Sequence, residues 1–338
     1  MPLTHYILLF FLLLALALGY VLLARRLGIV DRPLERSSHR HTTVRGGGIV
    51  FPVAALIWFF IVGWESPWAM AGLLLASLIS FADDLRGLPG GLRMGVHLLA
   101  VGLLFQEMGL YDMYWYWIAC AQILAIGWIN AFNFMDGING ITALYSLVLL
   151  GSFSLLNNAG RLLSPVFPGV VAGEWTTFFP AGLVGTVFVA VLAFSFLNFR
   201  PRALAFAGDV GSIGLAFLLS WLMIELMVYT HQVWWILFFA VYGIDAVITI
   251  LLRLLRGDNI FRPHRLHLYQ LLANEKGWPH LAVALAYATT QLAVNLLTIC
   301  LVFSGRMDWA VFILLGAGLA ALYLLIRQQV APVGFRTA

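Results

Sequence analysis

"HYILLFFLLLALALGYVLLA", residues 5–24, is a run of twenty residues without Asp, Glu, Lys or Arg. A helix needs about 20 apolar residues to cross the hydrocarbon core of a bilayer. Arg25 and Arg26 follow the run, whereas no basic residue precedes it and no small-residue cleavage site follows it. Because secretory signals carry their positive charge before the apolar stretch, this segment is predicted to be a membrane helix and not a signal peptide.

The remainder of the chain has the same character. The 338 residues are 62% hydrophobic and only 10% charged, with a mean hydropathy of +0.95, whereas soluble domains contain about 25% charged residues. We therefore predict an all-α polytopic membrane protein that forms one domain over residues 1–338. About eleven spans fit the apolar runs, with a partly interfacial segment as the alternative for the fifth: 5–24, 47–63, 68–82, 94–109, 113–130, 141–157, 178–197, 212–229, 233–252, 280–303 and 309–326.

The basic residues predict the orientation of these spans. All of the 19 Lys and Arg residues except Arg161 and Arg306 fall at the C-terminus or in the loops 25–46, 83–93, 198–211 and 253–279, all on one face. Basic loops stay in the cytoplasm, so this face is predicted to be cytoplasmic, with the N-terminus in the periplasm and the C-terminus in the cytoplasm. For Arg25, Arg26, Arg327 and Arg336, topology signalling is most of the explanation. Both cysteines, Cys120 and Cys300, lie in apolar runs and are predicted to be buried thiols outside any disulfide.

Polar residues gather in four segments on this same face, whereas the opposite loops carry only scattered acids. Asp83 and Asp84 end the run "SLISFADDLRG", residues 77–87, at a helix C-terminus where the dipole disfavours carboxylates. The other three segments are "NAFNFMDGING" (130–140), "NFRPRALAFAGDVGS" (198–212) and "FRPHRLHLYQLL" (261–272). On a continued helix, Asn130, Asn133 and Asp136 would share an arc of about 120°.

Each segment also has a plain structural interpretation. Asp209 or Ser212 could cap a helix that starts near residue 212, and a DG pair is often only a turn. An isolated histidine is more often structural than catalytic, and a carboxylate pair at a helix end could be a solvated boundary. Independent solvation, however, does not account for four such segments on one face.

This set of residues suits phosphate chemistry with a divalent cation. Asp83, Asp84 and Asp209 offer the oxygen ligands that Mg²⁺ prefers alongside substrate phosphates, and a cation there would offset the helix-end dipole. Arginines and histidines can bind a pyrophosphate whose charge grows on the leaving group. Asp245 stands apart inside the ninth apolar run. An intramembrane acid suggests a functional site, with a structural hydrogen bond to a neighbouring helix as the alternative.

Five motifs in order resemble those of the polyprenyl-phosphate N-acetylhexosamine-1-phosphate transferases, which include the MraY and WecA groups. The resemblance covers nearly the whole chain. It rests on "RSSHRHTTVRGGGI" (36–49), "ADDLRGL" (82–88), "NAFNFMDG" (130–137), "GDVGS" (208–212) and "PHRLHLYQLL" (263–272).

The resemblance implies transfer of a sugar 1-phosphate from a UDP-N-acetylamino sugar to undecaprenyl phosphate, with release of UMP. It implies Mg²⁺ or Mn²⁺ as cofactor, a bacterial inner-membrane enzyme with its active site at the cytoplasmic boundary, and no nucleic-acid partner; a homodimer is left open. The implied catalytic residues are Asp83, Asp84, Asp136, His264 and His267, and the implied metal ligands are Asp209 and Asp84. The implied substrate-binding residues are Asn130, Asn133, Asn198, Arg202, Arg262, Arg265 and Arg45.

Two departures place the chain within the family. Many relatives have DGxDG where this chain has "DGING", so Asn139 replaces the second acid. The histidine motif lacks three consecutive histidines, which weakens a peptidoglycan-precursor role. The pattern "HRLHLYQ" is more similar to the WbpL-like branch that initiates O-antigen in lipopolysaccharide, whose donors are 6-deoxy sugars such as UDP-FucNAc or UDP-QuiNAc. A UDP-GlcNAc transferase for another envelope polymer is the alternative.

Two other classes of protein compete with this interpretation. A polyprenyl-lipid transporter would share the apolar bundle, but transporter sites usually lie near the bilayer midplane between repeated halves, and no repeat is found in this sequence. A phosphatase or another lipid-intermediate transferase would share the phosphate chemistry. Within the transferase hypothesis, a single displacement competes with a covalent aspartyl-phosphate route.

Overall fold

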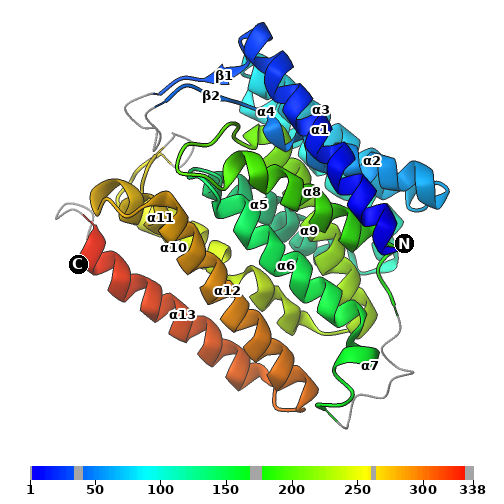
Figure 1. Ribbon diagram of the computed structural model, residues 1–338. Helices are drawn as coiled ribbons and strands as arrows, with labels where there is room; N and C mark the ends of the chain where they lie inside the picture. The colour runs from blue at the N-terminus through cyan, green and yellow to red at the C-terminus, as the bar shows by residue number, and fades with distance from the viewer. Residues whose placement is uncertain (1, 34–40, 168–176, 260–263, 332–338) are drawn as a thin grey trace.

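The computed structural model describes residues 2–33, 41–167, 177–259 and 264–331 and shows a bundle of helices with one short hairpin (Figure 1). The strands β1 and β2 pair antiparallel, with Val30 opposite Val44. The elements of the first half are α1 (Leu3–Leu27), β1 (Val30–Asp31), β2 (Thr43–Val44), η1 (Gly47–Ile49), α2 (Val50–Val62), α3 (Pro67–Arg86), α4 (Gly90–Glu107), η2 (Leu110–Asp112), α5 (Trp115–Met135), α6 (Ile141–Asn157) and α7 (Ala159–Leu162).

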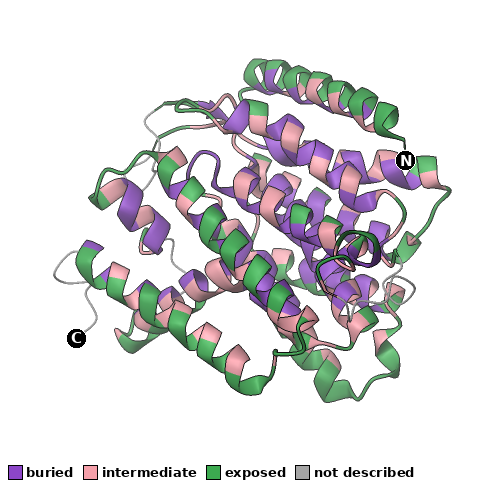
Figure 2. Cartoon of the chain, turned by 60° about the horizontal axis from the view of Figure 1, so that its bottom comes forward, coloured by how far each residue is buried: buried purple, intermediate pink, exposed green. Residues whose placement is uncertain are grey.

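The second half contains the centre of the bundle and its outermost helix. Its elements are α8 (Leu183–Asn198), α9 (Gly208–Thr230), η3 (Val233–Phe239), α10 (Ala240–Leu255), α11 (Leu268–Gln270), the short π-helix η4 (Leu271–Glu275), α12 (His280–Phe303) and α13 (Trp309–Val330). Among the long apolar helices α9 is the most buried and α13 the least, as the colours of Figure 2 show for the centre and the edge of the bundle. The helix α9 packs against α3, α5 and α2.

Each of the eleven predicted ranges contains a helix. In the described residues seven helical segments are long and apolar enough to cross a membrane, and three shorter apolar helices accompany them. A polytopic all-α membrane protein is therefore supported, while the number of eleven spans and their orientation stay predictions. The hairpin of β1 and β2 lies in the first basic loop, where no strand was predicted.

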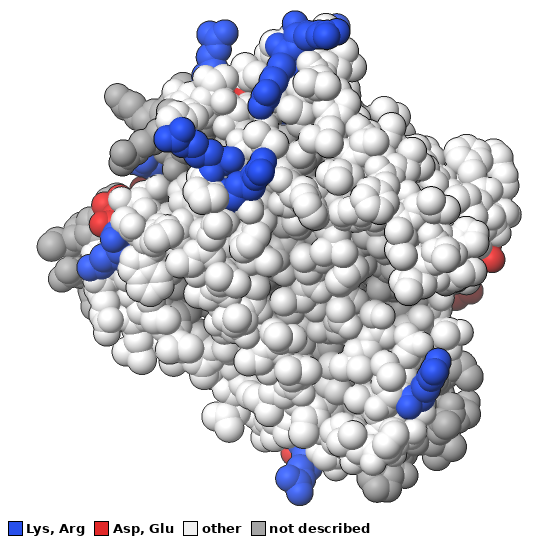
Figure 3. Space-filling view, viewed as in Figure 1, with Lys and Arg blue, Asp and Glu red and all other residues white. Residues whose placement is uncertain are grey.

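The charge asymmetry is visible on the folded molecule. In Figure 3 most Lys and Arg side chains gather at the upper left, at the end of the bundle that bears β1 and β2, and a few lie apart at the lower edge. We call the former the basic end; α3 and α5 finish there and α9 begins there. The basic residues Arg36, Arg40, Arg262 and Arg336 lie outside the described residues.

The two cysteines correct one prediction. Cys120 and Cys300 are both free thiols, but both are exposed on the outside of the bundle. The prediction that they are buried is therefore wrong. In a membrane protein an apolar run can face lipid as readily as it faces the core, so hydropathy does not indicate which side chains point inward.

The first basic loop reaches the centre of the bundle through a run of glycines. Gly47 donates its N–H to the carbonyl of Phe206 (2.8 Å), and Gly48 donates to the carbonyl of Ala207 (3.0 Å). A Cβ added to Gly48 would lie 2.5 Å from the Cα of Gly211 in α9. The backbones thus approach closely because neither residue has a side chain, and this contact sets the position of Arg45 just before the glycines.

Replacing Gly48 by alanine is expected to destabilise the protein by about 1–3 kcal/mol, because the added methyl group would overpack this contact. The measurement is thermal unfolding of the purified protein in detergent. Gly95→Ala is the matched control, since its added Cβ would meet no atom within 4 Å and alanine favours a helix. Equal melting temperatures for the two variants would contradict the close approach.

Candidate active site

Asp84, at the end of α3, caps the start of α9. Its Oδ1 accepts the backbone N–H of Asp209, and its Oδ2 accepts that of Val210, both at 3.0 Å. The Asp84 side chain is fully buried. A carboxylate is disfavoured at the C-terminus of its own helix but favoured at the N-terminus of another. The contact with α9 therefore explains why a carboxylate can end α3.

Two arginines complete a cluster around Asp209. The Nε of Arg45 lies 2.6 Å from Asp84, and its Nη2 lies 3.4 Å from Oδ1 of Asp209. Arg93 pairs with Asp83 and lies 3.3 Å from Oδ2 of Asp209. Burial alone would lower the pKa of Arg45, but the neighbouring carboxylates raise its pKa overall. We call these five residues the carboxylate–arginine cluster; with every group ionised it carries one net negative charge.

Exposure differs within the cluster and separates the roles of the two adjacent acids. Asp84 is fully buried with both oxygens engaged, whereas the side chain of Asp83 is 9% exposed and that of Asp209 is 18% exposed. Asp83 accepts the N–H of Leu88 (2.5 Å) and contacts Arg93. Asp83 and Asp209, together with the half-exposed arginines, are therefore the groups that a ligand can reach.

The end of α5 lies beside the start of α9. Ser212 donates its hydroxyl to Oδ1 of Asn133 (2.8 Å), and Thr142 donates to Oδ1 of Asp136 (2.5 Å). Burial, with added repulsion from Asp209 and Asp84, raises the pKa of Asp136 to about 7. Asn133 and Asp136 thus adjoin the cluster, but α5 ends at Met135, so Asp136 does not continue the helix on which the shared arc was predicted.

The side-chain amides of three asparagines donate hydrogen bonds to the protein itself. Asn130 donates to the carbonyl of Ile126 in its own helix (2.8 Å). Asn198 is buried; it accepts the N–H of Gly140 (2.7 Å) and donates to the carbonyl of Ala205 (3.0 Å). Asn139 donates to the carbonyls of Arg200 (2.9 Å) and Pro201 (3.2 Å). Asn198 and Asn139 therefore join the α5–α6 loop to the α8–α9 loop.

The segment 264–270 carries the histidines and lies next to the end of α5. His267 is buried, His264 is half-buried and Arg265 is exposed. Burial, together with the nearby His267 and Arg253, lowers the pKa of His264 to about 4. Tyr269 donates its hydroxyl to the carbonyl of Phe134 (2.8 Å), which ties the segment to the motif that ends in Asp136.

The structure thus brings together part of the predicted site. Within the described residues no hydrogen bond or ion pair joins the histidines to the carboxylate–arginine cluster. Arg202 is exposed in the α8–α9 loop, and Arg262 lies outside the described residues. The sequence analysis missed Arg93 and His97, which lie one turn apart on α4; His97 is buried. Both residues follow Asp83 across a turn that contains Gly87 and Pro89. This spacing was the sequence signal that could have identified them.

The cluster has the donor chemistry of a cation site. No group of three or more His, Cys, Asp or Glu side chains in the described parts of the chain could hold a metal ion by itself. Mg²⁺, however, is commonly held by only one or two carboxylates, with phosphates and water completing its shell. Asp83 and Asp209, the two acids that a ligand can reach, converge on one positive group, the Arg93 guanidinium, so these two carboxylates fit a cation completed by substrate. Asp84, one of the two implied metal ligands, already has both oxygens engaged within the protein.

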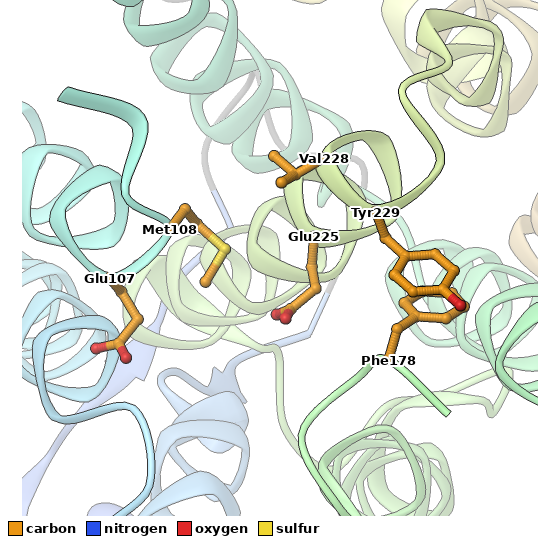
Figure 4. A pocket seen from close by; sticks show the side chains of 6 residues that line it. All are labelled: Glu107, Met108, Phe178, Glu225, Val228 and Tyr229. Carbon is orange, nitrogen blue, oxygen red and sulfur yellow. The ribbon is translucent and has the colours of Figure 1, made fainter. Parts of the chain in front are cut away.

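A separate pocket of about 260 Å³ lies at the other end of α9 and is lined by Glu107, Met108, Phe178, Glu225, Val228 and Tyr229. Figure 4 shows the rings of Phe178 and Tyr229 lying over one another beside Glu225. At 1.5 Å per residue, Glu225 lies roughly 24 Å along the helix from Asp209. The pocket is therefore not part of the carboxylate–arginine cluster.

Comparison with known proteins connects this geometry to an enzyme class. The sequence model of Glycosyl transferase family 4 matches residues 67–227, which include Asp83, Asp84, Asp136 and Asp209. The chain is 26% identical over 276 residues to the undecaprenyl-phosphate alpha-N-acetylglucosaminyl 1-phosphate transferase of Escherichia coli K12, covering 74% of this chain and 70% of the relative.

Relatives of a second kind also match this chain. The chain is 23% identical over 324 residues to a phospho-N-acetylmuramoyl-pentapeptide-transferase of Streptococcus pneumoniae, covering 84% of this chain and 93% of the relative. It is 30% identical over 205 residues to the transferase of that name from Desulfovibrio desulfuricans, covering 50% and 54%. Together these similarities support the superfamily that the motifs resemble.

Replacing Asn139 by aspartate is expected to destabilise the protein by about 1–3 kcal/mol, because a carboxylate cannot donate to the two carbonyls and would leave them unpaired. The melting temperature of the purified protein measures the effect. Asn139→Ala, which removes the donor without adding a charge, should lie between the native protein and Asn139→Asp. An aspartate variant as stable as the native protein would refute this explanation of the altered motif.

Asp136 should make stability depend on pH. Its pKa is 3.8 as a free group and about 7 in the folded protein. Between these values the unfolded chain is ionised while the folded protein keeps the proton, so its contribution to stability is fully present below the lower value and is lost as pH rises through the higher one. Melting temperatures of Asp136→Asn and native protein, compared from acid to neutral pH, should converge at low pH and diverge in favour of the variant as pH rises. A difference that does not change with pH would exclude the shift.

Proposed function

We propose that this protein transfers an N-acetylated amino-sugar 1-phosphate from a UDP-sugar to undecaprenyl phosphate and releases UMP. The observation that carries the proposal is the carboxylate–arginine cluster, in which three acids and two arginines from distant segments meet at a helix boundary. The similarity to transferases whose names specify undecaprenyl phosphate supports it. Phosphoryl transfer needs mainly positioning and charge stabilisation, and the cluster offers both.

The reaction is proposed as a single displacement. A phosphate oxygen of undecaprenyl phosphate attacks the β-phosphorus of the UDP-sugar. The bond from that phosphorus to the oxygen bridging the two phosphates breaks, and UMP leaves with the bridging oxygen and its electron pair. Arg45 and Arg93, whose side chains are both 36% exposed, can then bind the phosphate oxygens on which negative charge grows.

The two adjacent acids take different roles in this mechanism. Asp84, buried and bound to two N–H groups, holds Arg45 and the start of α9 in place. Asp83, which is closer to solvent, orients the attacking phosphate. Asp136, whose pKa is raised to about 7, can hold or release a proton near neutral pH. If a covalent route operated instead, a phosphorylated aspartate would accumulate with UDP-sugar alone.

Mg²⁺ or Mn²⁺ is the proposed cofactor, held chiefly by Asp209, because both oxygens of Asp84, the other implied ligand, are already engaged by the start of α9. When bound, the ion would neutralise charge on the pyrophosphate. The residues themselves position the substrates: the arginines face the phosphates, and Asn133 and Ser212, joined at 2.8 Å, hold the end of α5 against the start of α9.

The identity of the donor sugar is a further part of the proposal. The histidine motif favours a 6-deoxy donor of the UDP-FucNAc or UDP-QuiNAc type and hence initiation of O-antigen in lipopolysaccharide. UDP-GlcNAc is the second candidate, favoured by the N-acetylglucosaminyl group in the name of the Escherichia coli relative. The basic end is proposed to face the cytoplasm of a bacterial inner membrane, because all but two of the basic residues were assigned to that face.

UMP release should require both substrates together. Purified protein in detergent is given undecaprenyl phosphate, a divalent cation and each UDP-sugar in turn, and UMP is measured. Chelation of the cation should abolish release, and added Mg²⁺ should restore it. Asp209→Asn should lower kcat/KM by about 100-fold or more, as the loss of one charge-stabilising group does in other enzymes.

Asp112→Asn is the control, because Asp112 is exposed in η2 and lies on the loop predicted for the opposite face. It should leave activity unchanged. Full activity of Asp209→Asn would overturn the site assignment. Turnover with UDP-GlcNAc as the only accepted donor would overturn the preference for a 6-deoxy sugar. UMP release without the lipid would indicate hydrolysis instead of transfer.

A further inference from the structure

Asp245, buried in α10 within a membrane-crossing segment, holds the histidine segment in place. Its Oδ1 accepts the backbone N–H of Leu268 (3.0 Å) and lies 3.2 Å from Nδ1 of His267. Its Oδ2 accepts the N–H of Tyr269 at 3.5 Å. One carboxylate in the membrane region therefore fixes both the backbone and the imidazole of the segment.

Hydroxyl groups from three helices surround the same carboxylate. Tyr287 of α12 donates to it at 2.6 Å, Tyr323 of α13 at 3.1 Å and Thr249 of α10 at 3.2 Å. Arg327 of α13 donates to the Tyr323 hydroxyl (2.8 Å) and to the carbonyl of Leu266 (2.6 Å). A buried group that receives only donors is suited to be an ionised carboxylate, which accepts hydrogen bonds and cannot donate them.

This environment fixes the state of the imidazole. Because an ionised Asp245 can only accept, Nδ1 of His267 must carry the proton. The backbone N–H of Gln270 donates to the carbonyl of His267 at 3.0 Å, and the Gln270 side chain accepts the N–H of His267 at 3.4 Å. Imidazole geometry then points Nε2 away from Asp245. Among the described residues, His264 and Tyr269 lie beside the ring and Asp245 faces its Nδ1. The groups around Asp245 are Tyr287 from α12 and Tyr323 from α13, which donates to it and accepts from Arg327.

The other ring nitrogen has no partner among the described residues. The His267 side chain is only 2% exposed, and within the described part of the chain its Nε2 is buried without a hydrogen bond. An unpaired buried polar atom is costly, so a native structure that retains one calls for an explanation. The ring lies 6.3 Å from Phe134, two residues before Asp136, so this nitrogen is near the end of α5 that adjoins the cluster.

We infer that Asp245 is a positioning residue that keeps the His267 proton on Nδ1 and so directs Nε2 to a phosphate oxygen of a substrate. When Nε2 is protonated as well, it donates to that oxygen while Asp245 balances the charge of the ring. The inference rests on the proposed function for the identity of the phosphate. It assigns a role to an acid that lies within a membrane-crossing segment and outside the carboxylate–arginine cluster.

The first test reads the tautomer directly and needs no turnover. Protein labelled with ¹⁵N-histidine contains eight histidines, and His267→Gln identifies the signals of His267. The native spectrum should show a protonated Nδ1, and Asp245→Asn should lose this signature. UMP alone and a short polyprenyl phosphate alone are then titrated. A shift of the Nε2 signal with either one identifies the source of the phosphate, whereas no shift with either overturns the inference.

The second test separates positioning from structural support. Asp245→Asn should lower kcat by about 10- to 100-fold, the range found when a residue that orients a histidine is removed, and should change KM for the UDP-sugar by less. Tyr287→Phe removes a single hydroxyl and keeps the ring, so it replaces Asp245→Asn as the test variant if the latter does not fold. It should also shift the His267 signal and lower kcat.

Tyr145→Phe is the matched control, because this buried hydroxyl donates to Gln291 (2.7 Å) and not to Asp245. It should change neither the His267 signal nor kcat. Equal effects of Tyr287→Phe and Tyr145→Phe would show general structural support and overturn the inference. If native protein failed to release UMP while the tautomer signature held, only the proposed function would fail.

Discussion

The contact between Asp84 and the start of α9 is the constraint on which the basic end depends. A carboxylate at the C-terminus of α3 faces an unfavourable dipole, and burial in a membrane protein removes the water that would relieve it. Two backbone N–H groups at the N-terminus of α9 supply the compensating positive charge. One of these N–H groups belongs to Asp209, so the interaction that stabilises Asp84 also fixes the acid we assign to the cation.

The same contact brings the first basic loop into the site. Arg45 can bridge Asp84 and Asp209 only because its loop lies against the α8–α9 loop through hydrogen bonds from Gly47 and Gly48. Tyr20 adds a further restraint by donating its hydroxyl to the carbonyl of Arg45 (2.8 Å). A buried carboxylate needs a paired cation, and the glycines permit the close approach that delivers it. Stability and site geometry at this end therefore have a common origin.

The sequence alone predicted where the helices lie and that some of the motifs come together in space. It predicted less well which side chains contact each other. Apolar length locates helices in membranes, since every backbone group must be bonded within its own segment, and each predicted range does contain one. The roles of Asp83 and Asp84 could not be separated in this way, because adjacent residues differ only in what each faces after folding. Arg93 and Asn139 were missed as partners for the same reason, since their bonds to Asp83 and to the α8–α9 loop depend on tertiary packing. Cys120 and Cys300 show another limit: hydropathy does not distinguish a side chain that faces lipid from one that lies in the core.

Asp84 and Asp245 perform the same physical task in two places. Each is a buried carboxylate that accepts two successive backbone N–H groups at the start of another segment: those of Asp209 and Val210 for the first, and those of Leu268 and Tyr269 for the second. Each thereby fixes a neighbouring titratable side chain, Asp209 or His267. Each is also supported by an arginine, directly for Asp84 and through the Tyr323 hydroxyl for Asp245. A rigid acceptor inside the bundle can hold a neighbouring side chain more firmly than a loop could by itself, because the lost hydrogen bonds could not be replaced by water. This explains why an acid is retained within a membrane-crossing segment, where it would otherwise be costly.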